Sequence, residues 1–283
     1  MQNNTSIINK IIDWAKKEDE IKALILIGSL AGKGSIDELS DFDISVFATN
    51  LEKYAKDDSW FHNFEKVWVC EPCEFSRINK TYQTRLVIFK DGLQVDFALF
   101  DLDVLKDLTG RDELPVDYSL GYKVLLDKDG LTKNLKPPTF KCPEIPKPSK
   151  EEFELAIRIF FFEAFKQAKA LVRNDLWHAK IRDWITKKYL LKMIEWNEKA
   201  KHGWDYNVGC AGKRMQSLVA EDTWEKLHKT FAHFDAQDSW KALTATIDIF
   251  SQIAKQTAKL LGYEYLEDVD QNITMFIKNL KKN

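Results

Sequence analysis

Prolines are unevenly spread along this chain of 283 residues, and five of the seven lie within Asn134–Lys150. Proline fixes the backbone φ angle and has no N–H to donate, so such a stretch is typical of an extended linker. Short apolar runs precede it, whereas long stretches with helical periodicity follow it. We therefore predict two domains, residues 1–140 and 150–283, joined by a linker over 134–149.

The first predicted domain has the pattern of a sheet with flanking helices. Apolar side chains at helical spacing predict a helix over residues 5–17, with Asn4 or Thr5 as its N-cap. Apolar runs and alternating patterns predict strands over residues 23–27, 41–47, 66–70, 85–89 and 93–100. The turn at residues 90–92 makes the last two a hairpin, and residues 122–126 are either a final strand or the end of a helix.

The second predicted domain consists of helices. Ser149 and Glu152 form a capping-box pattern at its start. Helical periodicity then predicts helices near residues 150–173, 178–200, 221–233, 238–262 and 268–281. The predicted fold class is therefore α+β, with an N-terminal mixed β-sheet and flanking helices followed by a C-terminal all-α helical bundle.

Charge and apolar content exclude several classes of protein. Lys and Arg total 42 and Asp and Glu total 44, a balance that argues against a dedicated nucleic-acid binder. The longest apolar runs, such as Ala23–Ile27, are far shorter than the ~20 residues of a membrane span. The first ten residues are polar and lack the apolar core of a signal peptide. We expect a cytoplasmic monomer or weak dimer with no membrane and no nucleic-acid partner.

The four cysteines do not predict a disulfide scaffold. Cys70 and Cys73 form a CxxC pattern, but neither a second ligand pair nor a thioredoxin-like order of elements accompanies it. We expect neither a metal site nor redox chemistry there.

Gly28 and Ser29 follow the first predicted strand and indicate an anion-binding loop. A glycine lets backbone N–H groups approach an anion closely, and the serine hydroxyl adds a donor. A helix beginning directly after them would direct its positive end at the same place.

Asp41 and Asp43 lie two residues apart in the second predicted strand. Side chains at i and i+2 point to the same face, so both carboxylates would project together while Phe42, Ile44 and Val46 point into the core. Two adjacent carboxylates repel each other unless a cation lies between them, and hard oxygen ligands suit Mg²⁺. An Asp-x-Asp pair alone is more often two solvated charges, and its place after a Gly-Ser loop is what favours a metal site.

Asp96 is a third carboxylate, flanked by Val95 and Phe97 in a later predicted strand. Aspartate is rare inside an apolar strand and costly to bury without a charge partner. A metal shared with Asp41 and Asp43 would explain it. Three carboxylates, two metal ions and a phosphate-binding loop are typical of nucleotidyl transfer, in which Asp96 could take the proton of an acceptor hydroxyl.

These motifs resemble the nucleotidyltransferase superfamily with the DNA polymerase β-like fold, whose signature is a Gly-Ser, a spacer, an Asp-x-Asp and a later carboxylate. Within it, the chain resembles the aminoglycoside 6-adenylyltransferases, which modify streptomycin. Six stretches, spread over nearly the whole chain, carry this resemblance: Leu26–Phe47, Val95–Leu105, Val124–Asp129, Leu190–Trp196, Glu221–Leu227 and Asp270–Ile273.

The resemblance implies an antibiotic-resistance enzyme that transfers AMP from ATP to a streptomycin hydroxyl and releases pyrophosphate. It implies that Gly28 and Ser29 hold the triphosphate. Asp41, Asp43 and Asp96 would bind Mg²⁺, with two ions expected. The general base is either Asp96 or a carboxylate of the helical domain, which would close the cleft and line the drug pocket.

One residue of the loop departs from the family pattern. The family commonly has arginine directly after the Gly-Ser, where this chain has Leu30. An arginine there could pair with phosphate, so the nucleotide preference is open. Lys33 lies in the same loop and is a candidate substitute, although a lone exposed lysine is usually just solvated.

Three residues of the helical domain are further candidates. Aminoglycosides are polycations, and a pocket for them needs carboxylates and aromatic walls. Asp183 and Glu163 lie in apolar helical stretches and could bind drug cations, or instead pair with Lys187 and Lys166 along their own helices. Lys213, after a glycine between helices, could reach the triphosphate or be a solvated loop residue.

Two other functions remain open at this point. The same site could adenylylate another acceptor, such as a protein side chain, an RNA end or a different small molecule. Alternatively, the chain could be a non-catalytic module that senses a nucleotide. The complete set of Asp41, Asp43 and Asp96 argues against a sensor, whereas Leu30 keeps it open.

Overall fold

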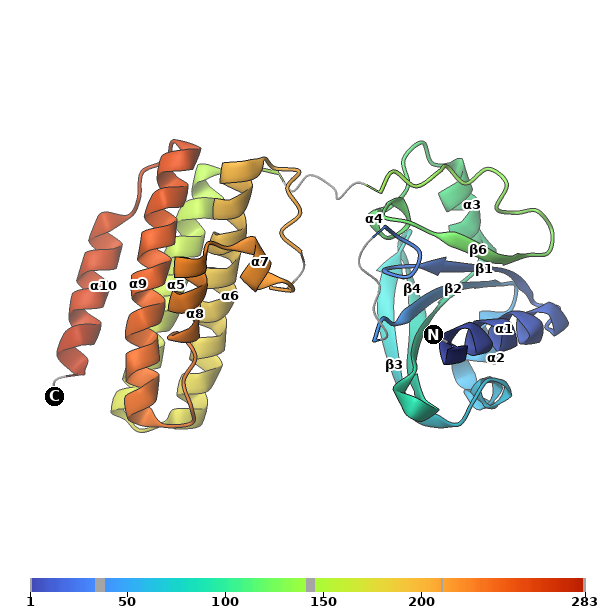
Figure 1. Cartoon of the computed structure of the whole chain (residues 1–283), viewed down its shortest axis with the longest axis horizontal. Coiled ribbons are helices and arrows are strands. Elements are labelled where there is room, and N and C mark those ends of the chain that lie inside the picture. The colour runs from blue at the N-terminus through green and yellow to red at the C-terminus, as the bar shows by residue number, and fades with distance from the viewer. Residues whose placement is uncertain (1, 34–38, 141–145, 210, 282–283) are drawn as a thin grey trace. The chain divides into compact units, whose positions relative to one another are not determined.

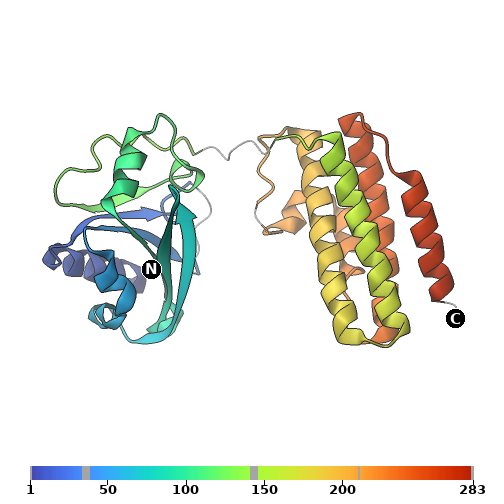
Figure 2. The ribbon, with the colours of Figure 1, turned by 180° about the vertical axis from the view of Figure 1, so that it is seen from behind.

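The computed structural model describes residues 2–33, 39–140, 146–209 and 211–281, with side chains from Ser6 onward. It divides into two compact units, Met1–Cys142 and Pro143–Asn283, and each is described by itself. Figures 1 and 2 show the two units from opposite sides. Of the predicted linker, residues 141–145 lie outside the described ranges, and residues 135–140 and 146–149 form neither helix nor strand.

The first unit contains a mixed sheet, as the sequence predicts, and this sheet has six strands. Its strands are β1 (Ile21–Ile27), β2 (Phe42–Ala48), β3 (Val67–Arg77), β4 (Lys80–Phe89), β5 (Gln94–Phe100) and β6 (Lys123–Asp127). Their order across the sheet is β3-β4-β5-β2-β1-β6. The central pair β2 and β5 is parallel, and the other neighbours are antiparallel.

Helices cover both faces of this sheet (Figure 1). The helices of the unit are α1 (Gln2–Lys17), α2 (Leu51–Lys56), α3 (Leu102–Gly110) and α4 (Val116–Ser119), with 3₁₀ turns η1 (Ser59–Asn63) and η2 (Lys90–Gly92). Ile44 and Val46 of β2 pack into a core with α1, α2 and η1, as the alternation predicts. Phe47, on the opposite face, packs with α3 and α4. The two faces of β2 therefore belong to two separate cores.

Three boundaries in this unit differ from the sequence prediction. Helix α1 begins at Gln2, so Asn4 and Thr5 lie inside the helix and neither is its N-cap. Strands β3 and β4 extend beyond the predicted ranges and meet in a tight turn at Ile78 and Asn79, which have positive φ. Tight turns of this kind usually contain glycine, which adopts positive φ easily. Isoleucine adopts it poorly, so the sequence at Ile78 and Asn79 does not indicate a turn. Residues 122–126 form a strand and not a helix end.

The second unit is a helical bundle, as predicted. Its helices are α5 (Lys150–Val172), α6 (Leu176–His202), α7 (Met215–Leu218), α8 (Glu221–His228), α9 (Ala236–Leu261) and α10 (Glu267–Leu280). The predicted capping box is present, since Ser149 Oγ accepts from the Glu152 N–H and the Glu152 carboxylate accepts from the Ser149 N–H. Phe160 and Phe250, at the centre of the core, stack with ring centroids 3.5 Å apart. None of the helices within the described ranges combines the length and apolar character that crossing a bilayer requires.

Candidate active site

Asp43 and Asp96 lie side by side in the middle of the sheet. Strands β2 and β5 run parallel with Asp43 opposite Asp96, so both side chains leave the same face of neighbouring strands, ~4.8 Å apart in the sheet. Both residues are only partly buried. The apolar residues next to them, Ile44 and Phe97, face the other core and hold the two strands in this register. The sequence pattern therefore places two of the predicted carboxylates together.

Gly28 lies against this pair from the neighbouring strand. It directly follows β1, whose last residue, Ile27, pairs with Asp43. Its φ is +73°, and a Cβ added to it would lie 2.0 Å from Asp43 Oδ2. Only glycine fits this position, because any side chain would collide with the carboxylate and strain the backbone.

The loop after Gly28 differs from the expected helix start. The Ala31 and Gly32 N–H groups both donate to the Gly28 carbonyl, at 3.2 and 3.1 Å, and residues 29–31 form a turn. Ser29 is exposed. Residues 34–38 lie outside the described ranges, so the described part of the loop offers a turn and not a helix N-terminus.

Asp41 takes a different place from the one predicted. Strand β2 begins at Phe42, so Asp41 precedes it and the same-face rule for strands does not fix its side chain. Asp41 is exposed. Within the described ranges, no three His, Cys, Asp or Glu side chains gather closely enough to hold a metal ion. Asp43 and Asp96 therefore form an adjacent pair, and Asp41, directly before β2, stays a predicted third member of the set.

The surroundings of Asp96 favour its neutral form. Burial raises the pKa of this carboxyl, and the negative charge of Asp41 raises it further. A hydrogen bond from Gln94 Nε2 to Asp96 Oδ1, at 3.1 Å, works in the opposite direction. Asp41 is therefore close enough for its charge to act on Asp96.

The residues present fit a hard divalent cation. Carboxylate oxygens are the ligands that Mg²⁺ and Ca²⁺ prefer, and Mg²⁺ is commonly held by one or two carboxylates together with substrate phosphates. Asp43 and Asp96 supply such a pair on adjacent strands. Burial and the negative charge of Asp41 both disfavour the ionised form of Asp96, and a cation bound at these carboxylates would offset both effects.

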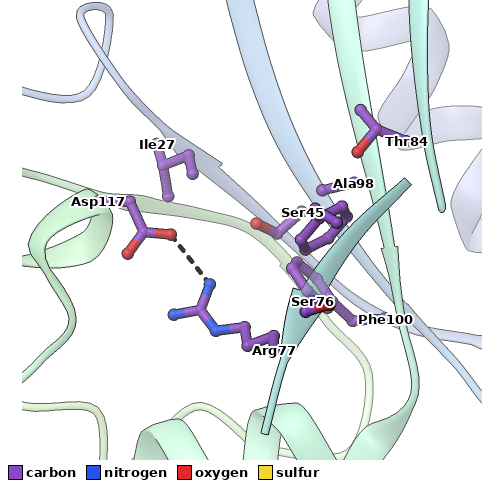
Figure 3. A pocket seen from close by; sticks show the side chains of 9 residues that line it. Ile27, Ser45, Ser76, Arg77, Thr84, Ala98, Phe100 and Asp117 are labelled. Carbon is purple, nitrogen blue, oxygen red and sulfur yellow. Dashed lines mark hydrogen bonds and ion pairs between the residues drawn. The ribbon is translucent and has the colours of Figure 1, made fainter. Parts of the chain in front are cut away.

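A cavity of about 470 Å³ opens on the same face of the sheet. Ser45 and Ala98 line it, and each is two residues beyond one of the paired carboxylates on the same strand. The remaining lining residues are Ile27, Phe75, Ser76, Arg77, Thr84, Phe100 and Asp117 (Figure 3). Arg77 and Asp117 come from the end of β3 and from α4, and no local sequence motif joins them, so neither is predicted from the sequence.

In the helical unit, Asp183 is paired within its own surroundings. Its Oδ1 accepts from Lys187 Nζ at 2.5 Å and from Gln167 Nε2 at 3.1 Å, and all three side chains are buried. Burial lowers the pKa of Lys187, and the charge of Asp183 opposes that effect. This is the intrahelical ion pair that the sequence offered as the alternative to drug binding.

Glu163 and Lys213 also lie in this unit. The Glu163 carboxylate accepts from Lys166 and from Arg182, each at 3.0 Å, so two cations already neutralise it. Lys213 is exposed in the loop before α7. Asp183, Glu163 and Lys213 therefore stand in a different unit from Gly28, Asp43 and Asp96.

The helical unit has a cavity of its own, of about 440 Å³. Its wall is aromatic and aliphatic, from residues such as Trp184, Trp224 and Phe231, and its charged members are Lys187 and Lys188. Among the described residues that line it, none is a carboxylate of the kind expected for a cationic ligand.

Comparisons with known proteins agree with the resemblance seen in the motifs. A family model described as streptomycin adenylyltransferase matches residues 1–280. Aminoglycoside 6-adenylyltransferase of Bacillus subtilis (strain 168) is 25% identical over 286 residues, covering 99% of this chain and 98% of the relative. The enzyme of the same name from Campylobacter jejuni is 26% identical over 289 residues, covering 100% and 97%.

A solved structure is also similar. The crystal structure of an aminoglycoside 6-adenyltransferase from Bacillus subtilis is 22% identical, covers 98% of each chain and has a TM-score of 0.47. The match to residues 1–280 spans almost the whole sequence and confirms the family and the enzyme class indicated by the motifs. The chain belongs to the streptomycin adenylyltransferase family, whose members are nucleotidyltransferases.

Proposed function

We propose that this enzyme transfers AMP from ATP to a hydroxyl of a streptomycin-like aminoglycoside and releases pyrophosphate. The observation that carries the proposal is the Asp43–Asp96 pair on adjacent parallel strands, with Gly28 pressed against Asp43. The names of the relatives support the acceptor class. A cytoplasmic enzyme of this kind would confer resistance to the drug.

The loop and the carboxylates would share the work of holding ATP. Gly28 lets the backbone approach closely, and the exposed Ser29 hydroxyl is available as a donor to a phosphate. Asp43 and Asp96, joined by Asp41, would hold Mg²⁺, with two ions expected. When bound, the cation would neutralise part of the negative charge of the triphosphate.

Asp96 is the residue proposed to move the proton. The acceptor oxygen attacks the α-phosphorus of ATP, its proton passes to an Asp96 carboxylate oxygen, and the bond to pyrophosphate breaks. Burial raises the pKa of Asp96, which makes its carboxylate a stronger base. Orientation of the two substrates and neutralisation of charge would contribute most of the rate enhancement.

The helical unit is proposed to hold the aminoglycoside. Asp183 and Glu163 would bind drug cations only by exchanging their present partners, Lys187 for one and Lys166 with Arg182 for the other. Lys213, exposed in its loop, is proposed to contact the triphosphate. Asp183→Asn and Glu163→Gln would raise the KM for the drug if this exchange occurs, and would leave it unchanged if the pairs are structural.

The proposal is tested by pyrophosphate release from ATP and Mg²⁺ with the purified enzyme. Release should require streptomycin, should be absent with kanamycin as the control drug, and should vanish in Asp43→Asn. ATP binding without release on any of a broad set of acceptors would instead indicate a nucleotide sensor. Release that depends on a different acceptor would retain the chemistry and replace the substrate.

A further inference from the structure

We propose that the cavity beside the carboxylate pair binds the nucleoside portion of the nucleotide, with Arg77 and Asp117 reading the edge of the base. This inference rests on the proposed function, because it assigns a subsite to the ATP of that reaction. It concerns residues of the first unit alone.

The position of the cavity fits a group attached to the α-phosphate. Ser45 follows Asp43 by two residues on β2, and Ala98 follows Asp96 by two on β5, so the lining begins about 7 Å from the carboxylates on the same face. Ile27, at the end of β1 next to Gly28, also lines it. A phosphate held at Gly28 and Asp43 would thus place its substituent at the mouth of the cavity.

The charge of the lining selects a neutral ligand. Its charged side chains are Arg77 and Asp117, joined by an ion pair of 2.9 Å between Nη1 and Oδ2 (Figure 3). A phosphate would meet a guanidinium already neutralised, and a polycationic drug would meet no excess of negative charge. The nucleoside is the uncharged portion of ATP, and it fits such a lining.

The chemistry of the wall fits a planar heterocycle. The half-buried Ile27, Phe75 and Ala98 provide apolar surface for the face of a base, and the buried Phe100 packs behind them. The Arg77–Asp117 pair presents donors and acceptors together, which is what the edge of an adenine requires. The volume of about 470 Å³ lies within the ~300–1,000 Å³ typical of small-molecule sites.

Arg77 is held in place before any ligand arrives. Its guanidinium packs 5.5 Å from the Phe100 ring centroid and 5.2 Å from that of Tyr118. The Tyr118 hydroxyl donates to Ser45 Oγ at 2.8 Å, which ties this arrangement to β2. Because the group is already ordered, a ligand would not have to immobilise it on binding.

Two hydroxyls of the lining are available to a ligand. Within the described parts of the chain, the side chains of Ser76 and Thr84 make no hydrogen bond. Hydroxyl donors and acceptors on a cavity wall suit the ribose or the ring nitrogens of a nucleoside. Thr84→Val keeps the shape of the side chain and removes only its hydroxyl, which makes it the mildest test of the site.

The test compares ATP with inorganic tripolyphosphate, a probe that carries the phosphates but no nucleoside. Dissociation constants are measured by calorimetry with Mg²⁺ for the full chain and for Thr84→Val, Arg77→Met and Asp117→Asn. Each variant should bind ATP about tenfold more weakly, the worth of one lost hydrogen bond of ~1.4 kcal/mol, and tripolyphosphate unchanged. Arg111→Met is the matched control, because Arg111 pairs with Asp107 at 2.7 Å outside the cavity.

Three outcomes would overturn the inference. Unchanged ATP affinity in all three variants would mean that the cavity does not hold the nucleoside. An equal loss for ATP and tripolyphosphate would make it a phosphate site, and a loss confined to streptomycin, titrated into the same proteins, would make it an acceptor site. Melting temperatures identify a variant that fails to fold, and Thr84→Val then decides the question.

Failure of the proposed function would look different. In that case the wild type binds ATP more tightly than tripolyphosphate, Thr84→Val abolishes this preference, and no drug is adenylylated. Such a result would support the nucleoside site and refute the aminoglycoside as the acceptor. The two conclusions are therefore separable in one set of measurements.

Discussion

Gly28 is where the backbone of one strand meets a carboxylate of the next. Two separate demands act on it, since its φ is +73° and a Cβ would lie 2.0 Å from Asp43 Oδ2. Gly92 has a similar φ of +77°, but a Cβ there would meet no atom within 4 Å. Substitutions at Gly28 and Gly92 therefore separate the effect of backbone strain from that of a collision with the Asp43 carboxylate.

Gly28→Ala should abolish pyrophosphate release, because it displaces the Asp43 carboxylate. Gly92→Ala should cost only ~1 kcal/mol of unfolding free energy from strain and retain full turnover. Turnover and urea unfolding of both variants check this. Equal activities in the two variants would mean that the contact between Gly28 and Asp43 plays no part in the reaction.

Asp127 stabilises the turn that follows β6. Its carboxylate accepts from the Leu131 N–H at 2.9 Å, and from the N–H and Oγ1 of Thr132 at 2.9 and 2.7 Å. Burial alone would raise the pKa of this carboxyl, but these hydrogen bonds outweigh it and lower the pKa. A depressed pKa means that the stabilisation is present above the unfolded pKa of ~3.9 and is lost as pH falls through the folded value.

Asp127→Asn should therefore lower the unfolding free energy by about 1–2 kcal/mol at pH 7. The difference between the variant and the wild type should shrink as the pH falls below ~4. Urea unfolding at pH 7 and pH 3 measures it. A difference that stays constant with pH would show that the ionised carboxylate is not what the turn requires.

At the scale of single residues, the sequence predicts the direction of side chains that lie within regular strands. The face from which Asp43 and Asp96 project follows from apolar neighbours that must face the core, whereas their adjacency depends on the pairing of β2 with β5, for which the sequence has no local signal. The direction of the Asp41 side chain is not predicted in this way, because Asp41 lies one residue before the strand. Arg77 and Asp117 are brought together only by tertiary folding, and no spacing in the sequence indicates them.

At the scale of elements, helix α6 carries a buried ion pair. Asp183 and Lys187 lie one turn apart, and Gln167 of α5 completes the set. Removing one member of a buried pair leaves an uncompensated charge, which is more costly than removing both. The exposed pair Asp222 and Lys226 on α8 has the same spacing and a similar distance of 2.7 Å.

Asp183→Asn should lower the unfolding free energy by about 3 kcal/mol. The double variant Asp183→Asn with Lys187→Met should be less destabilised than this single variant. Asp222→Asn, the matched surface control, should change it by less than ~0.5 kcal/mol. Chemical denaturation of the three proteins provides the comparison, and equal values for the two single variants would contradict a structural role for the buried pair.

The long helices match their predicted ranges best. Helices α5, α6, α9 and α10 are close to their predicted ranges, and each is at least 14 residues long, so several turns contribute to the pattern. The helix expected over 221–233 ends at His228, and α2, α3, α4 and α7 were not predicted. These elements are short, so tertiary packing decides them more than local pattern does.

At the scale of the whole molecule, the two units have separate cores. Residues of β1, β2 and β5 dominate the cores of the first unit, whereas the core of the second comes from helices α5 to α10. A domain with its own core can fold alone. The proposed roles follow the same division: the first unit holds the nucleotide, apart from the proposed contact of Lys213 with the triphosphate, and the second unit holds the drug.

Residues 1–142 expressed alone should fold cooperatively and bind ATP with Mg²⁺, but should not release pyrophosphate when streptomycin is added. Adding residues 143–283 as a separate chain at high concentration should restore part of the activity. Circular dichroism and calorimetry of the pieces check the folding and the binding. ATP binding by residues 143–283 alone would contradict the assignment of the nucleotide to the first unit.

The most direct measurement of the central claim is the mass of the drug after incubation with enzyme, ATP and Mg²⁺. Streptomycin should gain the mass of one AMP with the wild type and none with Asp43→Asn or Asp96→Asn, provided that both variants are folded. Unmodified streptomycin with the wild type would contradict the proposed reaction. Full modification by Asp43→Asn and Asp96→Asn would contradict the assignment of the reaction to this carboxylate pair.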